Sequence, residues 1–354
     1  SGSGTASSPY LISSAADLRL LSDECRNGNT FKGKYFKMTA DITINRNVLN
    51  DYTNEPNDDS NFERWIPIGR SSYKQKGFYG TFDGDGHTIS GIYINRVCTG
   101  RIGLFGNVLG NVKGITLKDS YISGYGGSIG GIVAYAVTNE CNVEISDCHN
   151  FATIVGDGNV GGVVGITGGS YAARVTQCSN HGYVKGVGGI VGSATADHTY
   201  ATDCVNAGNV ESFNCGAGII CYVNNATIKN CINTGNITAE LYAAGLGGRV
   251  MLSSTITNCV NLGRIDGAER SSALAYYSRG CTINWNYYLS SMSTSDIALK
   301  ENSTTNNNET CSSMEMKSED VLSGLNKRKG TGSSRWVEGD NNYPTLEWLA
   351  YYNL

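Results

Sequence analysis

The sequence predicts an all-β protein built as a parallel β-helix (β-solenoid) with short helical caps. Three observations carry this prediction: two interleaved repeats of about 28 residues, short β-branched runs between glycines, and the absence of helical periodicity. Glycine is abundant at 46 of 354 residues, and proline is scarce at 4. Charged residues make up 16% of the chain, against about 25% in a typical soluble domain. This composition suits many short strands joined by tight corners.

The first repeat is Cys-x-Asn-x-(Gly/Ala)-x-(Val/Ile), which occurs five times. Its copies are Cys148-Asn150-Ala152-Ile154, Cys178-Asn180-Gly182-Val184, Cys204-Asn206-Gly208-Val210, Cys231-Asn233-Gly235-Ile237 and Cys259-Asn261-Gly263-Ile265. Successive cysteines are 30, 26, 27 and 28 residues apart. A degenerate sixth copy is expected to have Trp285 in the cysteine place.

The second repeat is a pair of apolar residues between small ones. Its copies are Gly103-Leu104-Phe105-Gly106, Gly131-Ile132-Val133-Ala134, Gly162-Val163-Val164-Gly165 and Gly189-Ile190-Val191-Gly192, and then, in decaying form, Gly218-Ile219-Ile220-Cys221, Gly245-Leu246-Gly247-Gly248 and Ala273-Leu274-Ala275-Tyr276. Such a unit is shorter than the ~40 residues of a propeller blade. It cannot bury its apolar face alone, so it must stack on its neighbours. We therefore expect about seven stacked turns over residues 100 to 290.

Side-chain parity predicts a corner within each turn. Ile256 and Asn258 share one strand phase, while Cys259 and Asn261 share the other. Because side chains alternate with a period of two along a strand, both sets can face inward only if the chain bends between Asn258 and Cys259. The same phase break recurs at Asp147-Cys148, Gln177-Cys178, Asp203-Cys204 and Asn230-Cys231. Asn and Asp suit such corners because their side chains bond nearby backbone groups.

We expect four segments along the chain. They are a flexible tether over 1–9, an N-terminal cap with the first turns over 10–100, the β-helix repeats over 101–290, and a C-terminal loop and cap over 291–354. Ser14 precedes a short helix with Leu18 and Leu21 on its apolar side, and Ser318 precedes another. Helical caps would cover the open edges of the solenoid.

Charge and hydropathy exclude several classes of partner. The formal net charge of −4 argues against nucleic acid, which calls for a basic face. No apolar run reaches the ~18 residues of a membrane span. No cofactor motif is present. We expect an export signal, with or without a lipid tether, to have been removed from the N-terminal side.

The Gly103-Leu104-Phe105-Gly106 element and its copies resemble the GLUG motif. Gly80–Ile89 resembles the approach to such repeats, and Trp336 with Tyr343–Trp348 resembles the usual ending. The resemblance implies a right-handed parallel β-helix that is secreted or displayed on a bacterial cell surface, as in many gut Bacteroidetes. Some relatives belong to immunoglobulin-A-specific metallopeptidases. The zinc motif of such enzymes, His-Glu-x-x-His, is absent around His87, His149, His181 and His198.

The cysteine column resembles a metal site but has the wrong geometry for one. Stacked thiols form a line, whereas zinc requires a tetrahedron, so no metal site is predicted. Parallel side chains also keep the Cβ atoms too far apart for disulfides. We expect buried free thiols beside an amide ladder of the repeat asparagines. A disulfide stays open among Cys25, Cys98, Cys141, Cys215, Cys221, Cys281 and Cys311.

Aspartates and aromatic residues supply the candidate sites. Asp119 and Asp147, with Asp203 further along, are the candidate catalytic residues of a polysaccharide lyase or hydrolase, because carboxylates on neighbouring turns approach the ~5 Å of a retaining pair. The alternative is a structural corner, since Asn occupies the place elsewhere. The Asp83-Gly84-Asp85-Gly86 segment lacks the remaining ligands of a calcium loop and is expected to be a turn.

The candidate ligand-binding residues are Tyr276, Tyr277, Trp285, Tyr287 and Tyr288. Their rings suit stacking on sugars, although they would serve equally well as packing beneath a cap. The leading hypothesis is a non-catalytic, adhesin-like scaffold, extracellular or on the cell surface, that binds a glycan or a host protein. The alternative is a polysaccharide-cleaving enzyme.

Overall fold

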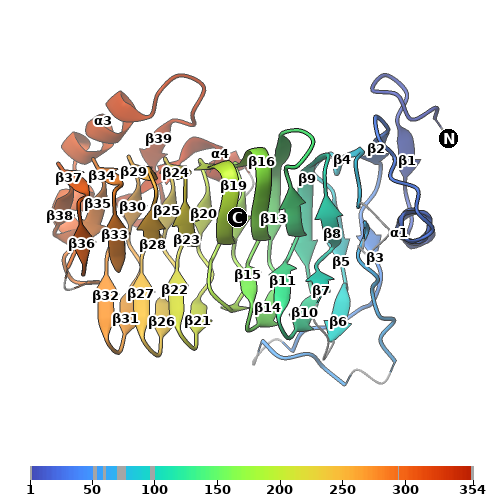
Figure 1. Ribbon diagram of the computed structural model, residues 1–354, viewed down its shortest axis with the longest axis horizontal. Helices are drawn as coiled ribbons and strands as arrows, with labels where there is room; N and C mark the ends of the chain where they lie inside the picture. Colours follow the sequence, from blue (N-terminus) through green and yellow to red (C-terminus); the bar gives the residue numbers. More distant parts are fainter. Residues whose placement is uncertain are drawn as a thin grey trace.

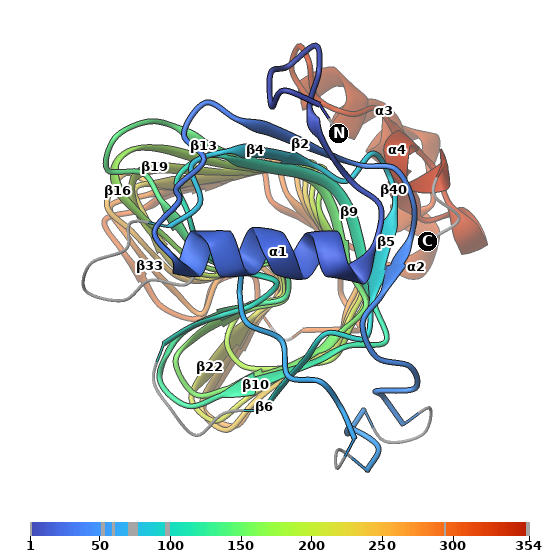
Figure 2. The ribbon, with the colours of Figure 1, turned by 90° about the vertical axis from the view of Figure 1, so that its right-hand side faces the viewer.

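The chain winds into a right-handed parallel β-helix of about nine turns, with about 49% strand and 9% helix. This computed structural model describes residues 2–50, 54–58, 61–69, 77–95, 100–293 and 295–351. Figure 1 shows the turns stacked along the long axis. Viewed from the N-terminal end in Figure 2, the chain runs clockwise as it recedes, which makes the helix right-handed. The predicted fold class is confirmed, and the nine turns include the first turns before residue 100 and the turn formed by residues after 290.

Each full turn carries up to five short strands, which stack into five columns of parallel strands. Column 1 holds β1 (Tyr10–Ile12), β2 (Tyr35–Met38), β4 (Thr81–Asp83), the first halves of β9 (Asn111–Lys118) and β13 (Val143–Asn150), the second halves of β16 (Val164–Thr176) and β19 (Val191–Thr202), β24 (Ala226–Lys229), β29 (Thr255–Thr257), β34 (Thr282–Asn284) and β37 (Thr304–Asn306). Column 2 holds β3 (Ile42–Thr43), β5 (Thr88–Ser90), the second halves of β9 and β13, β17 (Ser179–Asn180), β20 (Val205–Asn206), β25 (Ile232–Asn233), β30 (Val260–Asn261), β35 (Tyr287–Leu289) and β38 (Glu309–Cys311).

The other three columns complete the turn. Column 3 holds β6 (Tyr93–Asn95), β10 (Tyr121–Gly124), β14 (Thr153–Gly156), β18 (Val184–Lys185), β21 (Val210–Ser212), β26 (Ile237–Ala239) and β31 (Ile265–Gly267). Column 4 holds β7 (Gly100–Ile102), β11 (Gly127–Gly130), β15 (Asn159–Gly161), β22 (Cys215–Ala217), β27 (Tyr242–Ala244) and β32 (Arg270–Ser272). Column 5 holds β8 (Phe105–Val108), β12 (Val133–Val137), the first halves of β16 and β19, β23 (Ile220–Asn224), β28 (Gly247–Met251), β33 (Tyr277–Arg279) and β36 (Lys300–Glu301).

The predicted corner lies between columns 1 and 2. Its residues have left-handed backbone, with φ of 53° at Asp147, 51° at Gln177, 56° at Asp203, 54° at Asn230 and 56° at Asn258. Asn and Asp tolerate this conformation better than most residues do. The predicted bend is therefore confirmed.

One register prediction at this corner is wrong. Trp285 has a φ of 59° and occupies the corner place itself. Because Tyr287 pairs with Val260, the residue aligned with Cys259 is Asn286. Its side chain donates to the Ile256 carbonyl at 3.1 Å. A polar residue thus replaces the thiol at the end of the cysteine column.

The repeat asparagines form the predicted amide ladder through the interior. Each buried side chain donates Nδ2–H to the Oδ1 of the next, at 2.8, 2.9, 2.8 and 2.8 Å along Asn150, Asn180, Asn206, Asn233 and Asn261. The same nitrogen also donates to the carbonyl two residues onward. Every rung therefore satisfies buried amide groups within its own turn and between turns.

The first glycine of the second repeat packs against this ladder. A Cβ added at Gly131, Gly162, Gly189, Gly218 or Gly245 would lie 2.5 or 2.6 Å from the Oδ1 of the asparagine in the same turn. The two repeats are thus two halves of one contact. In the turn where Ala273 replaces the glycine, Tyr288 occupies the asparagine place.

The five repeat cysteines, Cys148, Cys178, Cys204, Cys231 and Cys259, are buried free thiols. Each thiol donates to the carbonyl two residues earlier and to a carbonyl of the preceding turn. They line the core as small apolar residues, as predicted.

The N-terminal cap is the predicted helix, α1 (Ala15–Arg26), which lies across the end of the barrel in Figure 2. Ser14 is its N-cap and accepts from Asp17 N, while Leu18 and Leu21 are buried. Residues 3–8, expected to be a flexible tether, form a turn with a Thr5–Ser8 bridge. The Asp83–Gly86 segment forms the expected turn before β5.

The C-terminal segment folds back along the flank of column 2. It comprises α2 (Ser313–Met316), α3 (Glu319–Arg328), β39 (Trp336–Glu338), η1 (Asp340–Asn342), β40 (Pro344–Leu346) and α4 (Glu347–Tyr351). Ser318 is the N-cap of α3, as predicted. Its apolar residues cover outward-facing residues of column 2, such as Val205, Ile232 and Val260. The polar stretch before it, expected to be a loop, supplies β36, β37 and β38 and so adds a turn.

Replacing Asn206 with Leu should destabilise the solenoid by about 2–6 kcal/mol, because it leaves two buried amide partners unsatisfied at ~1–3 kcal/mol each. The partners are Nδ2 of Asn180 and Oδ1 of Asn233. Urea unfolding followed by circular dichroism measures the change. The matched control is Asn214→Leu, at an exposed position in the same turn, which should change stability little. Equal effects would contradict the ladder.

The five repeat thiols should resist alkylation in the native protein, because burial of the Cys148, Cys178, Cys204 and Cys231 side chains raises each thiol pKa and excludes reagent. Iodoacetamide labelling followed by peptide mass spectrometry tests this. Cys141, an exposed free thiol, is the internal control and should be labelled first. Denaturation should then expose all five as free thiols. Disulfides between successive positions would contradict the stacking geometry.

Candidate ligand-binding groove

A groove of about 340 Å³ lies on the late turns, between columns 4 and 5. Its lining includes four tyrosines and two arginines. The lining residues are Asn214, Cys215, Tyr222, Tyr242, Arg249, Arg270, Tyr276, Tyr277 and Leu299. A concave, aromatic-lined surface with a few convergent polar groups is typical of a ligand site.

Strand register builds the two walls of this groove as two rows. In column 4, Cys215 pairs with Tyr242, which pairs with Arg270. Residues paired in this way point to the same side of the sheet, one strand spacing of ~4.8 Å apart. The first row therefore places a ring between a thiol and a guanidinium.

The second row lies in column 5, where Tyr222 pairs with Arg249 and Arg249 with Tyr277. The Arg249 guanidinium lies 5.6 Å from the Tyr277 ring centroid, within cation–π range. Across the groove the Arg270 guanidinium lies 5.3 Å from the Tyr242 ring. Each wall thus presents a ring and a cation side by side.

Tyr276 lies at the base of the groove, between the two walls. Its ring is buried and stacks on Tyr242 at 5.2 Å with an interplanar angle of 25°. Tyr222, Tyr242 and Tyr277 are half-buried, so each keeps part of its surface exposed while its position is held by packing. Rings fixed in this way lose little conformational entropy when a ligand binds.

The decay of the second repeat explains why the groove forms only on the late turns. The fourth position of this repeat is a glycine in early turns, as at Gly165 and Gly192. A Cβ added there would lie within 2.8 Å of the backbone of column 4, at Ile129 for Gly165 and at Val160 for Gly192. In the late turns two side chains, Cys221 and Tyr276, take this place, and Gly248 between them leaves room for the Tyr276 ring. Side chains then fill the junction between the columns in place of close backbone contact.

Two thiols lie beneath the rings. The Sγ atoms of Cys215 and Cys221 are 3.3 Å apart, and the Cys215 Sγ lies 2.9 Å from the Tyr222 hydroxyl oxygen. The hydrogen bond from the Cys221 thiol lowers the pKa of Cys215 to about 6, and burial raises that of Cys221. Of the cysteines left open for a disulfide, these two therefore lie together as free thiols, and Cys98 lies outside the described residues.

The predicted aromatic residues lie in three different places. Tyr276 and Tyr277 line the groove. Trp285 and Tyr287 lie beneath α3, where the Arg328 guanidinium is 4.0 Å from the Trp285 ring and donates to the Tyr287 hydroxyl at 3.1 Å. Tyr288 packs against the interior core. Two of the five thus lie under the C-terminal segment, two line the groove, and one belongs to the core.

Sequence reasoning missed Tyr222, Tyr242, Arg249 and Arg270. They lie far apart along the chain and meet only through the register of columns 4 and 5. The signal that marked them was the loss of glycine at the fourth motif position, which identified the altered turns.

The expected pairing of Asp119 with Asp147 is wrong. Asp147 lies at the corner between columns 1 and 2, where its place in the preceding turn belongs to Gly114 and in the next to Gln177. Asp119 follows β9 at the next corner, where it accepts a hydrogen bond from Leu49 N at 2.9 Å. No second carboxylate lies one strand spacing from Asp147 in its column.

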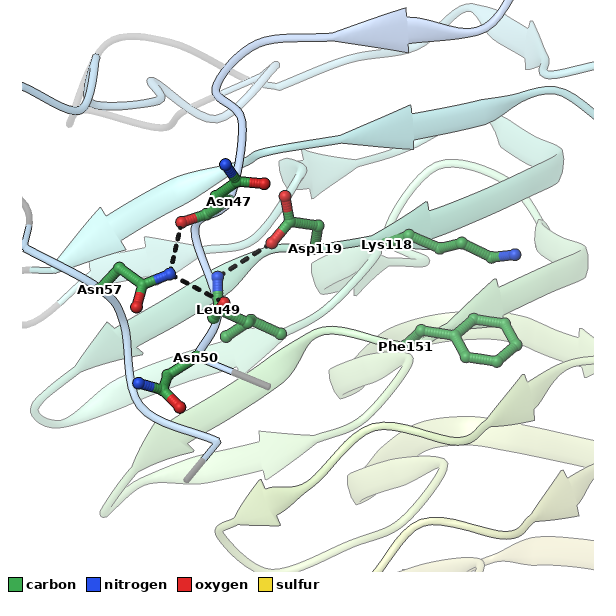
Figure 3. Close-up of a pocket in the computed structure, with 7 residues that line it drawn as sticks. All are labelled: Asn47, Leu49, Asn50, Asn57, Lys118, Asp119 and Phe151. Atoms are coloured by element: carbon green, nitrogen blue, oxygen red, sulfur yellow. Dashed lines mark hydrogen bonds between the residues drawn. The ribbon is translucent and has the colours of Figure 1, made fainter. Parts of the chain in front are cut away.

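Asp119 lines a separate hollow of about 720 Å³, shown in Figure 3. Lys118, Phe151 and the loop residues Asn47, Leu49, Asn50 and Asn57 line it with Asp119. The carboxylate points toward the Leu49 backbone and fixes the loop.

The other two corner aspartates also have structural partners. The His149 Nε2 lies 3.3 Å from the Asp147 Oδ1. Asp203 accepts from Asn230 Nδ2 at 3.1 Å and Ser334 N at 3.1 Å, and burial raises its pKa. Asp203 therefore anchors the C-terminal segment.

Within the part of the chain that the structure describes, no cluster of three His, Cys, Asp or Glu side chains is arranged to hold a metal ion. The described helices also include none with the length and hydropathy needed to span a membrane.

Comparisons with known proteins support the fold and bear on location. No family model matches the chain. It is 33% identical over 168 residues, 47% of its length, to "Halomucin" of Haloquadratum walsbyi, and 32% identical over 150 residues, 41% of its length, to "Putative Gly-rich membrane protein" of Evansella cellulosilytica. The chain spans only 2% and 15% of those relatives.

A solved structure has the same fold over nearly the whole chain. It is titled as a putative immunoglobulin A1 protease from Bacteroides ovatus, with a TM-score of 0.57 and 18% identity, covering 98% of this chain and 94% of that one. At this identity the likeness shows a shared β-helix and carries no activity across.

Proposed function

We propose that this chain is a non-catalytic β-helix scaffold, extracellular or on the cell surface, that binds a glycan through the groove between columns 4 and 5. The observation that carries the proposal is the pair of facing rows, in which Tyr242, Tyr222 and Tyr277 present partly exposed rings. Tyrosine offers a flat apolar face with a polar tip. That combination matches a sugar, which has an apolar face and hydroxyls at its edge.

The groove is better suited to binding than to cleavage. Its lining includes no carboxylate, whereas glycoside hydrolysis uses a pair of them. The corner aspartates bond instead to protein groups: Asp119 to the Leu49 amide, and Asp203 to Asn230 and Ser334. A host protein remains the alternative partner for the same surface.

The proposed location rests on the two sequence relatives. One is named halomucin and the other a Gly-rich membrane protein. A repeat solenoid with few charges and a long, continuous core suits display outside the cell, as an adhesin-like spacer with a ligand site on its flank.

Replacing Tyr222 or Tyr277 with Ala should weaken glycan binding about fivefold or more, because truncating a central interface aromatic costs ~1 kcal/mol or more. The ligand is first found on a glycan array and its Kd is then measured by calorimetry. Tyr171→Ala is the matched control, since that tyrosine is exposed and lies outside the groove. Thermal melts should change little in all three variants.

Tyr287→Ala provides the opposite test. This ring is buried beneath the C-terminal segment, so its loss should cost ~3–5 kcal/mol of stability while the Kd of the folded protein stays unchanged. A binding defect for Tyr287→Ala without one for Tyr277→Ala would contradict the proposed site.

The non-catalytic part of the proposal is tested by reducing-sugar and unsaturated-product assays on a polysaccharide panel. The wild type and Asp147→Asn should both release no product and should share one melting temperature, because Asn already occupies this corner at Asn230 and Asn258. Cleavage by the wild type that Asp147→Asn abolishes would establish the enzyme alternative instead.

A further inference from the structure

We infer that the ligand of the groove is an acidic glycan, whose sugar units carry carboxylate or sulfate groups. This inference rests on the proposed function, because it assigns a chemical class to the ligand of the same groove. It is carried by the charge of the walls: the lining includes two arginines, Arg249 and Arg270, and no aspartate or glutamate.

Within the described residues neither guanidinium forms an ion pair with a carboxylate, unlike their neighbours, although the charge of Arg249 helps to lower the pKa of the Cys215 thiol. Arg264 pairs with Asp266 at 3.2 Å, and Arg279 lies 3.8 Å from Glu301. Arg249 and Arg270 instead lie over tyrosine rings. An arginine held over a ring keeps its N–H groups available at the edge of the plane, where they can bind a carboxylate or sulfate in a bidentate manner.

Two carboxylates contact tyrosines of the groove and lie outside its lining. Glu301 accepts from the Tyr277 hydroxyl at 3.0 Å and faces Arg279. Glu269 lies beside Tyr242 and raises the pKa of its phenol. These contacts hold the two acids against tyrosine hydroxyls, outside the lining of the groove, so they do not neutralise the guanidiniums by direct pairing.

The placement of the two arginines on different walls and in successive turns suits a polymer. Arg249 belongs to the column 5 wall, and Arg270 belongs to the column 4 wall one turn further on. Each cation has a ring next to it in its row. A chain of acidic sugars can place successive units on the rings and successive charges on the two guanidiniums.

The test compares polymers that differ only in charge. Oligogalacturonate is measured against its methyl ester, and dextran sulfate against dextran, by calorimetry on the full chain. The wild type should bind at least one charged polymer about tenfold or more tightly than its neutral counterpart, as expected for hydrogen bonds to charged groups. The pair that shows the gain identifies carboxylate or sulfate as the recognised group.

Arg249→Gln and Arg270→Gln should each remove most of that gain. Arg174→Gln is the matched control and should leave it unchanged, since Arg174 is exposed and lies over Tyr200 in another column. Equal affinity for charged and neutral polymers, or a gain that survives in both variants, would overturn the acidic-ligand inference and leave glycan binding intact. Failure of all four polymers to bind would also overturn the acidic-ligand inference, whereas failure of every glycan on the array would overturn the proposed function itself.

Discussion

The fold depends on one interior contact, the packing of a glycine against the side-chain amide of an asparagine in every central turn. The amide bonds to the amides above and below it, and to the backbone of its own turn. The glycine leaves room for it, because any Cβ would lie within 2.6 Å of the amide oxygen. Since an unsatisfied buried amide is costly, this contact fixes both the phase of each turn and its register on the next.

A register fixed from the inside leaves the outside free to vary. Turn after turn, an outward-facing residue lies directly over its equivalent, so a row of side chains can change character without disturbing the core. The late turns show this. Tyr222, Arg249 and Tyr277 succeed one another in one row, while the asparagine ladder beneath continues to Asn261. The groove therefore results from a change in outward-facing residues over an unchanged interior.

The repeats could be predicted from the sequence because they encode contacts between residues at fixed separations. The corner at Asn258, the burial of Cys204 and the helix starts at Ser14 and Ser318 follow from local parity and capping. The pairing of Asp119 with Asp147 failed for a physical reason. In the turn before Asp147 a glycine, Gly114, takes the left-handed corner. Because the sequence pattern sought Asp or Asn at this corner, it assigned the corner to the next aspartate, Asp119, instead.

Tertiary contacts account for what sequence reasoning missed. The C-terminal segment returns along column 2 through contacts such as Trp348 Nε1 donating to the Asp203 carbonyl at 3.1 Å, across 145 residues. No local pattern encodes such a return. The walls of the groove likewise combine strands from different columns and turns. In the sequence, only the decay of the glycine motif indicated that the late turns differ. A side chain in place of a close-packed glycine forces the two columns to pack differently there.

The return of the C-terminal segment also determines which flank can receive a ligand. It covers the apolar row of column 2, while the groove between columns 4 and 5 stays open. The whole chain carries a formal charge of −4, so at a distance it repels an acidic polymer weakly. At physiological salt such long-range repulsion is screened beyond ~8 Å, whereas the guanidinium contacts act within hydrogen-bonding distance. Recognition in this groove would therefore depend on fit between rings and cations, and the acidity of the rest of the surface would disfavour non-specific adhesion of polyanions elsewhere on the molecule.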